Sequence, residues 1–268
     1  MRLPLPLLSF FILPLYALPT PGHSPKPPFF LLAGDSTTAK QSSNGGGWGN
    51  GFLNTTLSHG ASGLNYGHNG ATTVSFRAGG DWATVLSKVA EYKDRYTPYV
   101  TIQFGHNDQK AAANISIAEY TRNLERFACE ARDAGATPIL VTPLSRRNYQ
   151  TSNVTGEPTI ILSLADQRAA TIEAARNSRA AYVDLNRAST RYLNSIGPEE
   201  AYTYNLTPDD RTHLNTEGSI VFGGMVAELI DGVFAGLQKA GYVRVNPRLK
   251  RALDRGEYYW PDDSVEEW

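Results

Sequence analysis

Short apolar segments alternate with amphipathic segments through most of this chain. The apolar segments are rich in β-branched and aromatic residues, as strands are. They span residues 29–33, 63–66, 99–104, 138–142 and 181–185. The amphipathic segments carry apolar residues at every third or fourth position, the spacing of a helix with one buried face. They span residues 81–96, 117–134, 163–178 and 216–240. This alternation predicts an α/β fold in which helices cover both faces of a parallel sheet.

The N-terminal segment has the composition of a secretory signal peptide. A single cation, Arg2, precedes a nearly uninterrupted apolar run to about Leu18, and small and turn-forming residues follow. The run is short for a membrane span and is broken by prolines. We therefore expect residues 1–18 to be a signal peptide cleaved between Ala17 and Gly22, and the mature protein to be secreted, extracellular and free of the membrane.

The rest of the chain is expected to form one domain. A proline-rich lead at residues 19–28 precedes a domain at 29–268, whose charged and irregular tail begins at about residue 245. With 268 residues, 41% of them hydrophobic, the chain can bury a sizeable core. A net charge of −1 gives no basic field for phosphate backbones, which argues against a nucleic-acid partner. The charge raises no objection to a monomer.

Four N-glycosylation sequons agree with secretion. They begin at Asn54, Asn114, Asn153 and Asn205. Cys129 is the only cysteine, so an internal disulfide is impossible. It lies among apolar residues at helical spacing, and we expect it to be a buried, inert thiol.

Polar clusters follow the first three predicted strands. Residues 34–38, Gly-Asp-Ser-Thr-Thr, leave the first strand, and residues 65–70 and 105–109 leave the second and third. The carboxyl ends of parallel strands lie at one edge, where open α/β sheets bind ligands. Gly-Asp-Ser after a strand also makes an ordinary turn. Three polar loops at one edge nevertheless predict a functional site.

One histidine has the neighbour that acyl transfer by a serine requires. Ser36 would supply the hydroxyl, a histidine must take its proton, and a carboxylate must orient that histidine. His213 has Asp210 three residues before it in a short loop, and Asp209 is a second carboxylate. The same loop could instead be a turn and helix cap that leaves His213 exposed. The spacing alone leaves both interpretations open.

Donors for an oxyanion are also present. They are the backbone N–H of Ser36, Gly70, which lets an ester approach the main chain, and the Asn107 amide, which donates without competing for the serine proton. Gly70 could equally be a turn glycine, and Asn107 could only tie two loops together. The chain lacks the common zinc, paired-cysteine and phosphate-binding motifs, and it lacks Gly-x-Ser-x-Gly. We expect no metal and no cofactor.

Four sequence blocks, in order, resemble those of the SGNH (GDSL-type) hydrolase superfamily. The blocks are Gly34-Asp35-Ser36, Asn65-x-Gly67-x-x-Gly70, Gly105-His106-Asn107-Asp108 and Asp210-x-x-His213. The resemblance covers about residues 29–240 and implies a three-layer α/β/α sandwich with a five-stranded parallel, flavodoxin-like sheet. It also implies that Ser36 is the nucleophile, His213 the base and Asp210 its orienter. The Ser36 N–H, the Gly70 N–H and the Asn107 side chain would then form the oxyanion hole.

The longer strings "GDSTTAK", "GGWGNGF" and "FGHNDQ" resemble the rhamnogalacturonan acetylesterases, which remove acetyl groups from pectin. This implies an acetylated plant polysaccharide as substrate, in contact with Asp35, Trp48 and His106. Trp48 could stack against a sugar or be a core or lid tryptophan. Two departures concern the substrate. Relatives often have a basic, serine-rich stretch after the second block, where the first cation here is Arg77, and often have disulfides.

Two alternatives remain at this stage. The first keeps the chemistry and changes the substrate to acetylxylan or a lipid ester. The second is a catalytically inactive carbohydrate-binding protein that retains the site.

Overall fold

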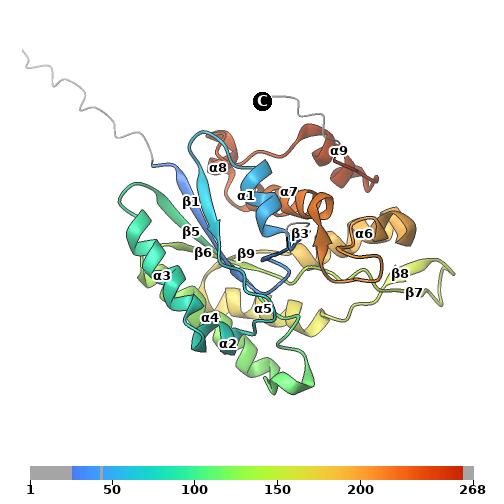
Figure 1. The fold of residues 1–268 in the computed structure, drawn as a ribbon, viewed down its shortest axis with the longest axis horizontal. Helices are drawn as coiled ribbons and strands as arrows, with labels where there is room; N and C mark the ends of the chain where they lie inside the picture. The colour runs from blue at the N-terminus through green and yellow to red at the C-terminus, as the bar shows by residue number, and fades with distance from the viewer. Residues whose placement is uncertain (1–25, 43–44, 262–268) are drawn as a thin grey trace, which may run out of the picture.

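A five-stranded parallel sheet forms the centre of the molecule (Figure 1). The computed structural model describes residues 26–42 and 45–261, so the expected signal peptide lies outside the described residues. The strands are β1 (Pro28–Gly34), β4 (Ser62–Asn65), β5 (Thr97–Gln103), β6 (Thr137–Val141) and β9 (Ala181–Val183). Their order, β4-β1-β5-β6-β9, is that of flavodoxin-like sheets, in which the strand order reverses between β1 and β5.

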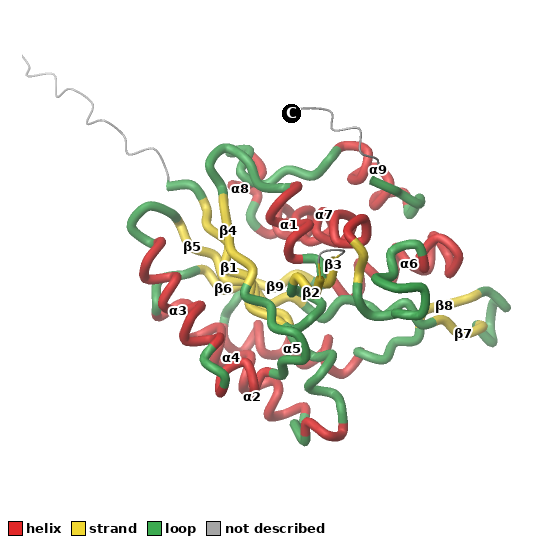
Figure 2. The backbone as a smooth tube through the Cα atoms, viewed as in Figure 1, coloured by secondary structure: helices red, strands yellow, loops and turns green. Residues whose placement is uncertain are grey.

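Helices cover both faces of the sheet (Figure 2). On one face lie α1 (Gly49–Thr55), α6 (Leu185–Tyr202), α7 (Thr216–Val233), α8 (Ala235–Lys239) and α9 (Pro247–Arg255). On the other lie α2 (Thr73–Ala78), α3 (Asp81–Tyr92), α4 (Ile117–Asp133) and α5 (Ala165–Ser178). Side chains of β1 alternate between the two cores, with Phe30 and Leu32 in the first and Phe29 and Leu31 in the second. The three-layer sandwich is therefore as predicted.

Two small antiparallel sheets accompany the central one. Strands β2 (Lys40–Ser42), β3 (Gly45–Gly46) and β10 (Leu214–Asn215) form a three-stranded sheet in the order β10-β3-β2. This sheet joins the chain that follows β1 to the chain that precedes α7. Strands β7 (Tyr149–Thr151) and β8 (Pro158–Ile160) form a hairpin that projects from one side of the molecule (Figure 1).

All five expected strands and four expected helices are present, with ends shifted by a few residues. The expected helix at 216–240 is interrupted at Phe234, whose φ of −120° and ψ of 65° are not helical, and continues as α8. The tail was wrongly expected to be irregular. It contains α9, which begins with an Asn246 cap followed by Pro247 and buries Leu249 and Ala252. No helix among the described residues has the length and apolar character needed to cross a bilayer.

The expectation of a buried Cys129 was wrong, because the side chain is exposed. Helix α4 buries Leu124, Phe127, Ala128 and Ala131 against the second core. A residue advances about 100° around a helix, so the position after Ala128 turns away from that face. Apolar spacing around a residue therefore did not establish its own burial.

Helices α1 and α7 approach closely through glycine. The Gly51 N–H donates to Ser219 Oγ over 3.0 Å, and a Cβ added to Gly51 would lie 1.9 Å from the Ser219 carbonyl oxygen. Gly223 is similarly confined, because its added Cβ would lie 2.3 Å from the Phe52 nitrogen. Backbone lies against backbone here, so neither position can hold a larger side chain without separating the helices.

Gly51→Ala is expected to lower the free energy of unfolding by about 1–3 kcal/mol, because the methyl group has no space. Gly232→Ala, near the end of α7, is the control, since nothing lies within 4 Å of its added Cβ. It should leave stability unchanged or raise it by up to about 1 kcal/mol. Equilibrium urea unfolding measures both, and an equal effect of the two substitutions would contradict the packing argument.

Asp231 on α7 is a buried carboxylate without a full set of partners. The residue is 6% exposed, and its Oδ1 accepts no hydrogen bond. It borders a cavity of about 320 Å³ near α9, in which Lys250 donates instead to Glu228 over 2.5 Å. Burial raises the pKa of Asp231 to about 7, and Glu228 adds to the rise while Lys250 opposes it.

This shift makes stability depend on pH. The unfolded carboxyl titrates near pH 4 and the folded one near 7, so folded protein retains a proton that unfolded protein releases. Stability therefore falls as pH rises from about 4 through 7. Asp231→Asn should match the wild type near pH 4 and exceed its unfolding free energy by about 1–3 kcal/mol at pH 8. Chemical unfolding at both pH values tests this, and a pH-independent difference would refute it.

Candidate active site

Ser36, His213 and Asp210 form a continuous chain of hydrogen bonds. His213 Nε2 lies 2.9 Å from Ser36 Oγ, and His213 Nδ1 lies 2.8 Å from Asp210 Oδ2. Asp209, the alternative carboxylate, is exposed and has no bond to this histidine. The loop also contains a helix cap, as the other interpretation required: the Asn215 side chain accepts from the Gly218 N–H at the start of α7. The cap is therefore Asn215, and His213 is left to face Ser36.

Ser36 lies in a tight turn at the carboxyl end of β1. The Asp35 carbonyl accepts from the N–H groups of Thr38 and Ala39, and the Asp35 carboxylate accepts from the N–H and hydroxyl of Thr37. Gly34 is required before the turn, because an added Cβ would lie 2.3 Å from Thr38 Oγ1. These contacts leave Ser36 Oγ directed at the histidine rather than at its own backbone.

The buried amide of Gln103, at the end of β5, holds this turn from below. Its Oε1 accepts from Thr38 Oγ1 over 2.8 Å and from Trp48 Nε1 over 2.7 Å. Its Nε2 donates to Thr37 Oγ1 over 2.7 Å. All four side chains are fully buried. The amide therefore fixes the nucleophile turn to β5 and to the start of α1.

Arg147 fixes the loop that carries the histidine. The side chain is fully buried. Its Nε donates to Asn205 Oδ1 over 2.6 Å, and its Nη2 donates to the carbonyl oxygens of Asp210 and His213. Burial lowers the pKa of Arg147 to about 10, so the guanidinium remains charged at neutral pH. No sequence motif identified Arg147 in advance, because its partners lie 58 to 66 positions away.

Asp210 stays ionised beside the histidine. Burial works against its charge, but hydrogen bonds from the backbone N–H groups of His213 and Thr212 and from the His213 ring hold the pKa of Asp210 below its usual value. A fixed carboxylate at Nδ1 selects the tautomer whose Nε2 can accept a proton from Ser36. It can also stabilise the imidazolium that results.

Gly70 and Asn107 lie on the two loops beside Ser36. The loop after β4 is fixed by the His68 N–H, which donates to the Gly34 carbonyl over 2.9 Å. Asn107 Nδ2 donates to the Ala71 carbonyl over 3.0 Å, which leaves one amide hydrogen without a bond. Among the described residues the backbone N–H groups of Ser36 and Gly70 have no protein acceptor. Three donors of the expected kind are therefore available at this edge.

Two further contacts orient Asn107 and its loop. Lys110 Nζ donates to Asn107 Oδ1 over 2.6 Å, which fixes the amide with its nitrogen toward Ala71. Asp108 Oδ1 accepts from the N–H and hydroxyl of Thr73, at the start of α2. Asp108 therefore ties the loop after β5 to the loop after β4, although burial raises the pKa of this carboxyl.

Asp35, Trp48 and His106 were expected to contact substrate, and this was wrong for the structure as it stands. Asp35 and Trp48 are fully buried, and His106 is 2% exposed. Asp35 turns back to bond Thr37, and Trp48 bonds Gln103. Trp48 is thus a core tryptophan, which was one of its two interpretations. These residues support the turn that a substrate would meet.

His106 and Asp35 form a second buried pair beneath the site. His106 Nδ1 lies 3.7 Å from Asp35 Oδ2, and neither atom has a hydrogen-bond partner among the described residues. Burial lowers the pKa of His106, although Asp35 opposes this change. The imidazole is therefore neutral near pH 7, and the positive charge of a reacting site would form at His213 instead.

The sequons differ in accessibility. Asn54, Asn114 and Asn153 are exposed. Asn205 is 6% exposed, and its amide accepts from Arg147 and donates to the Pro208 carbonyl. The expectation of a glycan at Asn205 was therefore wrong for the folded chain, because its amide is already part of the loop that carries His213.

The cation after the second block does not reach the site. Arg77 forms an ion pair with Glu130 on α4, with 2.9 Å between Nη2 and Oε2, and lies over the Phe127 ring. Within the described residues no three histidine, cysteine, aspartate or glutamate side chains are grouped to hold a metal ion. The cationic groups that contact the site loops include Lys110, the buried Arg147, and Arg146, which donates to the His106 carbonyl over 3.4 Å.

Known proteins share this arrangement. The family model described as the GDSL-like Lipase/Acylhydrolase family matches residues 32–219, a span that includes Ser36, Asn107 and His213. The chain belongs to this family. Its members hydrolyse esters, so the chain is a carboxylic-ester hydrolase, and the predicted resemblance to the SGNH (GDSL-type) hydrolases is confirmed.

Two similar proteins of Bacillus subtilis (strain 168) are rhamnogalacturonan acetylesterases by name. The rhamnogalacturonan acetylesterase RhgT is 30% identical over 221 residues, which are 77% of this chain and 90% of RhgT. The probable rhamnogalacturonan acetylesterase YesY is 29% identical over 206 residues, which are 74% of this chain and 89% of YesY. The resemblance of this GDSL-like hydrolase to rhamnogalacturonan acetylesterases is thus confirmed.

Solved structures share the fold. The structure of YxiM from Bacillus subtilis superposes with a TM-score of 0.66 at 24% identity and covers 78% of this chain, which in turn spans 57% of that one. The acetylxylan esterase Axe2 from Geobacillus stearothermophilus superposes with a TM-score of 0.54 at 17% identity, covering 82% of this chain and 97% of its own. At these identities the likeness establishes the α/β/α fold of the GDSL-like hydrolase.

Arg147→Met is expected to lower the free energy of unfolding by about 3 kcal/mol, because it leaves acceptors of Asn205 and Asp210 without a donor and leaves the His213 carbonyl with only the Leu206 N–H. Arg147→Lys should recover only part of the loss, since an ammonium lacks the planar fork. Arg122→Met on exposed α4 surface is the control and should stay within about 0.5 kcal/mol. Equal stability of the Arg147 and Arg122 variants would show that Arg147 does not hold the loop.

Proposed function

We propose that the protein is a secreted carbohydrate esterase that removes O-acetyl groups from plant cell-wall polysaccharide by way of an acyl-serine intermediate. One observation carries the proposal: the 2.9 Å contact of Ser36 Oγ with His213 Nε2, continued by the 2.8 Å contact of His213 Nδ1 with Asp210. A nucleophile, a base and an orienter at hydrogen-bond distance are what acyl transfer requires.

Ser36 Oγ attacks the acetyl carbonyl carbon while His213 Nε2 takes the hydroxyl proton. The tetrahedral intermediate collapses, the bond to the sugar oxygen breaks, and His213 returns the proton to that oxygen, so the sugar leaves as an alcohol. Water then attacks the acetyl-enzyme with His213 again as base. Acetate leaves and Ser36 regains its proton. Asp210 remains a carboxylate throughout and stabilises the imidazolium.

The negative oxygen of the tetrahedral intermediate would be held by the N–H groups of Ser36 and Gly70 and by Asn107 Nδ2. Support comes from their free hydrogens and from the contacts with Ala71 and Lys110 that orient the amide. Because these donors are fixed before the reaction, little reorganisation is needed as charge develops. A donor of this kind typically contributes on the order of 10²–10³ in turnover.

Acetylated rhamnogalacturonan is the substrate we favour. Two similar proteins of comparable length carry that substrate in their names, at 29% and 30% identity. Acetylxylan is the second candidate, since Axe2 shares the fold. A lipid ester is less well supported, because both similar proteins of comparable length are named for a polysaccharide substrate and the cavity between α1 and α7 carries ammonium, amide and hydroxyl groups. A lipid chain would instead require an extended apolar groove.

Secretion and glycosylation belong to the same proposal. They rest on the composition of residues 1–18 and on the exposed sequons at Asn114 and Asn153, which do not line the cavity between α1 and α7, whereas Asn54 does. A polysaccharide of the cell wall is available only outside the cell, so the location and the substrate agree.

The proposal is tested by acetate release from acetylated rhamnogalacturonan, acetylxylan and a small aryl acetate. Wild type is expected to act selectively on the rhamnogalacturonan, and Ser36→Ala should fold normally and lose nearly all turnover on every substrate. Ser62→Ala, an exposed serine of β4, is the matched control and should keep full activity.

Every other outcome would contradict one part of the proposal. Activity only on xylan or the aryl ester would retain the Ser36 mechanism and overturn the substrate. Full activity of Ser36→Ala would overturn the mechanism. Polysaccharide binding without any acetate release, and without labelling by a serine-reactive phosphonate, would favour the inactive carbohydrate-binding protein.

A further inference from the structure

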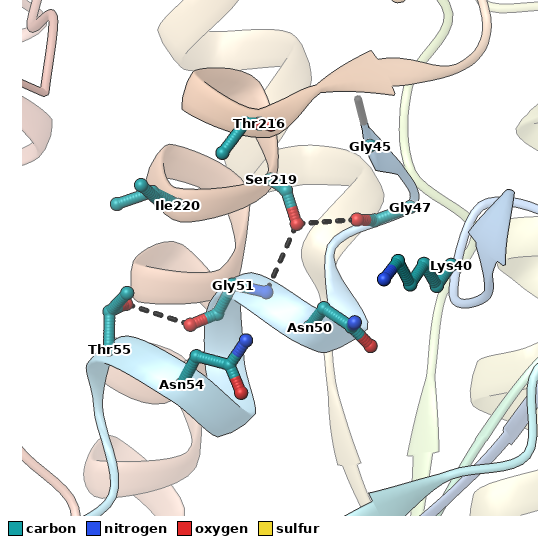
Figure 3. A pocket seen from close by; sticks show the side chains of 10 residues that line it. All are labelled: Lys40, Gly45, Gly47, Asn50, Gly51, Asn54, Thr55, Thr216, Ser219 and Ile220. Atoms are coloured by element: carbon teal, nitrogen blue, oxygen red, sulfur yellow. Dashed lines mark hydrogen bonds between the residues drawn. The ribbon is translucent and has the colours of Figure 1, made fainter. Parts of the chain in front are cut away.

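A cavity of about 310 Å³ lies between α1, Lys40 of β2, Gly45 of β3 and the first turn of α7 (Figure 3). Ser36, Asp210 and His213 do not line it. Carbon atoms, including those of three glycines, make up most of its exposed lining, and the polar side chains are distributed among them. The polar side chains include Lys40, Asn50, Asn54, Thr55 and Ser219. The mixed lining is suited to a sugar ring, which has apolar C–H faces and hydroxyl groups at its rim.

The wall of this cavity is built by contacts that leave no room for side chains. Ser219 Oγ accepts from the Gly51 N–H over 3.0 Å and donates to the Gly47 carbonyl over 2.7 Å (Figure 3). A Cβ added to Gly47 would lie 2.0 Å from the Thr37 carbonyl oxygen. The wall is therefore fixed in place before any ligand arrives, which lowers the entropy cost of binding.

Strand pairing connects the wall of the cavity to both segments that carry catalytic side chains, the one with Ser36 and the one with His213. Lys40 follows Ser36 by four residues and pairs with Gly46 of β3, and Gly46 pairs in turn with Leu214, the residue after His213. The Trp48 N–H, beside the glycine wall, donates to the Thr37 carbonyl over 2.9 Å. A polysaccharide bound at Ser36 could therefore place a neighbouring sugar in this cavity.

Lys40 is the charged group of the cavity. Its side chain extends along the cavity toward Asn50 (Figure 3). No carboxylate forms an ion pair with its ammonium within the part of the chain that the structure describes. Asn50 Oδ1 accepts from Asn65 Nδ2 over 2.9 Å, so the Asn50 amide is held in one orientation with its own nitrogen free to donate. Ammonium and amide donors together fit one carboxylate and its adjacent hydroxyl groups.

From this arrangement we infer that the cavity is a subsite for an acidic sugar, a uronic acid residue of the polysaccharide, with its carboxylate on Lys40. The inference rests on the proposed function, because that function supplies the polysaccharide. Such a subsite would distinguish a polysaccharide that contains acidic sugars from a neutral one.

Direct binding tests the subsite without requiring turnover. The ligands are a deacetylated rhamnogalacturonan oligosaccharide and the same oligosaccharide with its carboxyl groups reduced to alcohols. Titration calorimetry on protein made without N-glycans, so that Asn54 is unmodified, gives the dissociation constants. Wild type should bind the acidic ligand about tenfold more tightly than the reduced one, and added salt should narrow that difference.

Lys40→Met should weaken binding of the acidic ligand about tenfold and leave binding of the reduced ligand unchanged. Lys40→Arg keeps the charge and should retain most of the preference. Lys88→Met is the matched control, because Lys88 pairs with Glu91 on α3, and it should bind as wild type does. Melting temperatures confirm that all variants are folded.

Three results would overturn the subsite: no effect of Lys40→Met, an equal effect on both ligands, or no binding of either ligand by wild type. The proposed function fails separately. Wild type that binds the acidic oligosaccharide through Lys40 but releases no acetate keeps the subsite and loses the esterase. Wild type that releases acetate without any Lys40-dependent binding keeps the esterase and loses the subsite.

Discussion

The side chain of Gln103 is the interaction on which the rest of the site depends. One buried amide accepts from Thr38 and Trp48 and donates to Thr37, so three segments that meet at the carboxyl edge of the sheet are held by a single group. A buried amide satisfied on both sides has one orientation only, because reversing it would face donors with donors. The turn that presents Ser36 is therefore held rigidly against the central strand β5, whereas an ordinary surface loop would be mobile.

Charge is arranged in two tiers around this turn. The upper tier, His213 and Asp210, is partly exposed, and its imidazole can exchange protons with a reacting group while Asp210 stays ionised. The lower tier, His106 and Asp35, is buried, and the lowered pKa of His106 keeps it out of proton exchange near neutral pH. Arg147 lies beside the upper tier and supplies a positive charge to carbonyl groups, not to the carboxylate directly. Only one imidazole of the site is thus placed to act as a base.

The sequence predicted the parts of the molecule that depend on local pattern. Buried parallel strands are continuous apolar runs and amphipathic helices repeat every three or four residues, so the sheet, both helical layers and the loops that bear Ser36, Gly70, Asn107 and His213 could be expected. The prediction failed where a residue's environment is set by distant segments. Trp48 is buried in the first core, where it bonds Gln103, and Asn205 bonds the buried Arg147, 58 positions away. Nothing near either residue in the sequence carries that information.

Ser36 and His213 are separated by 177 positions along the chain, although their side chains touch. Domains are synthesised from the N-terminus at about 5–20 residues per second. The serine and most of the sheet are therefore complete well before the segment that bears the histidine has emerged. Throughout that interval the serine is an ordinary alcohol, because nothing nearby can remove its proton. The chain therefore cannot cleave esters until the segment with His213, β10 and α7 has been synthesised and has folded onto the rest.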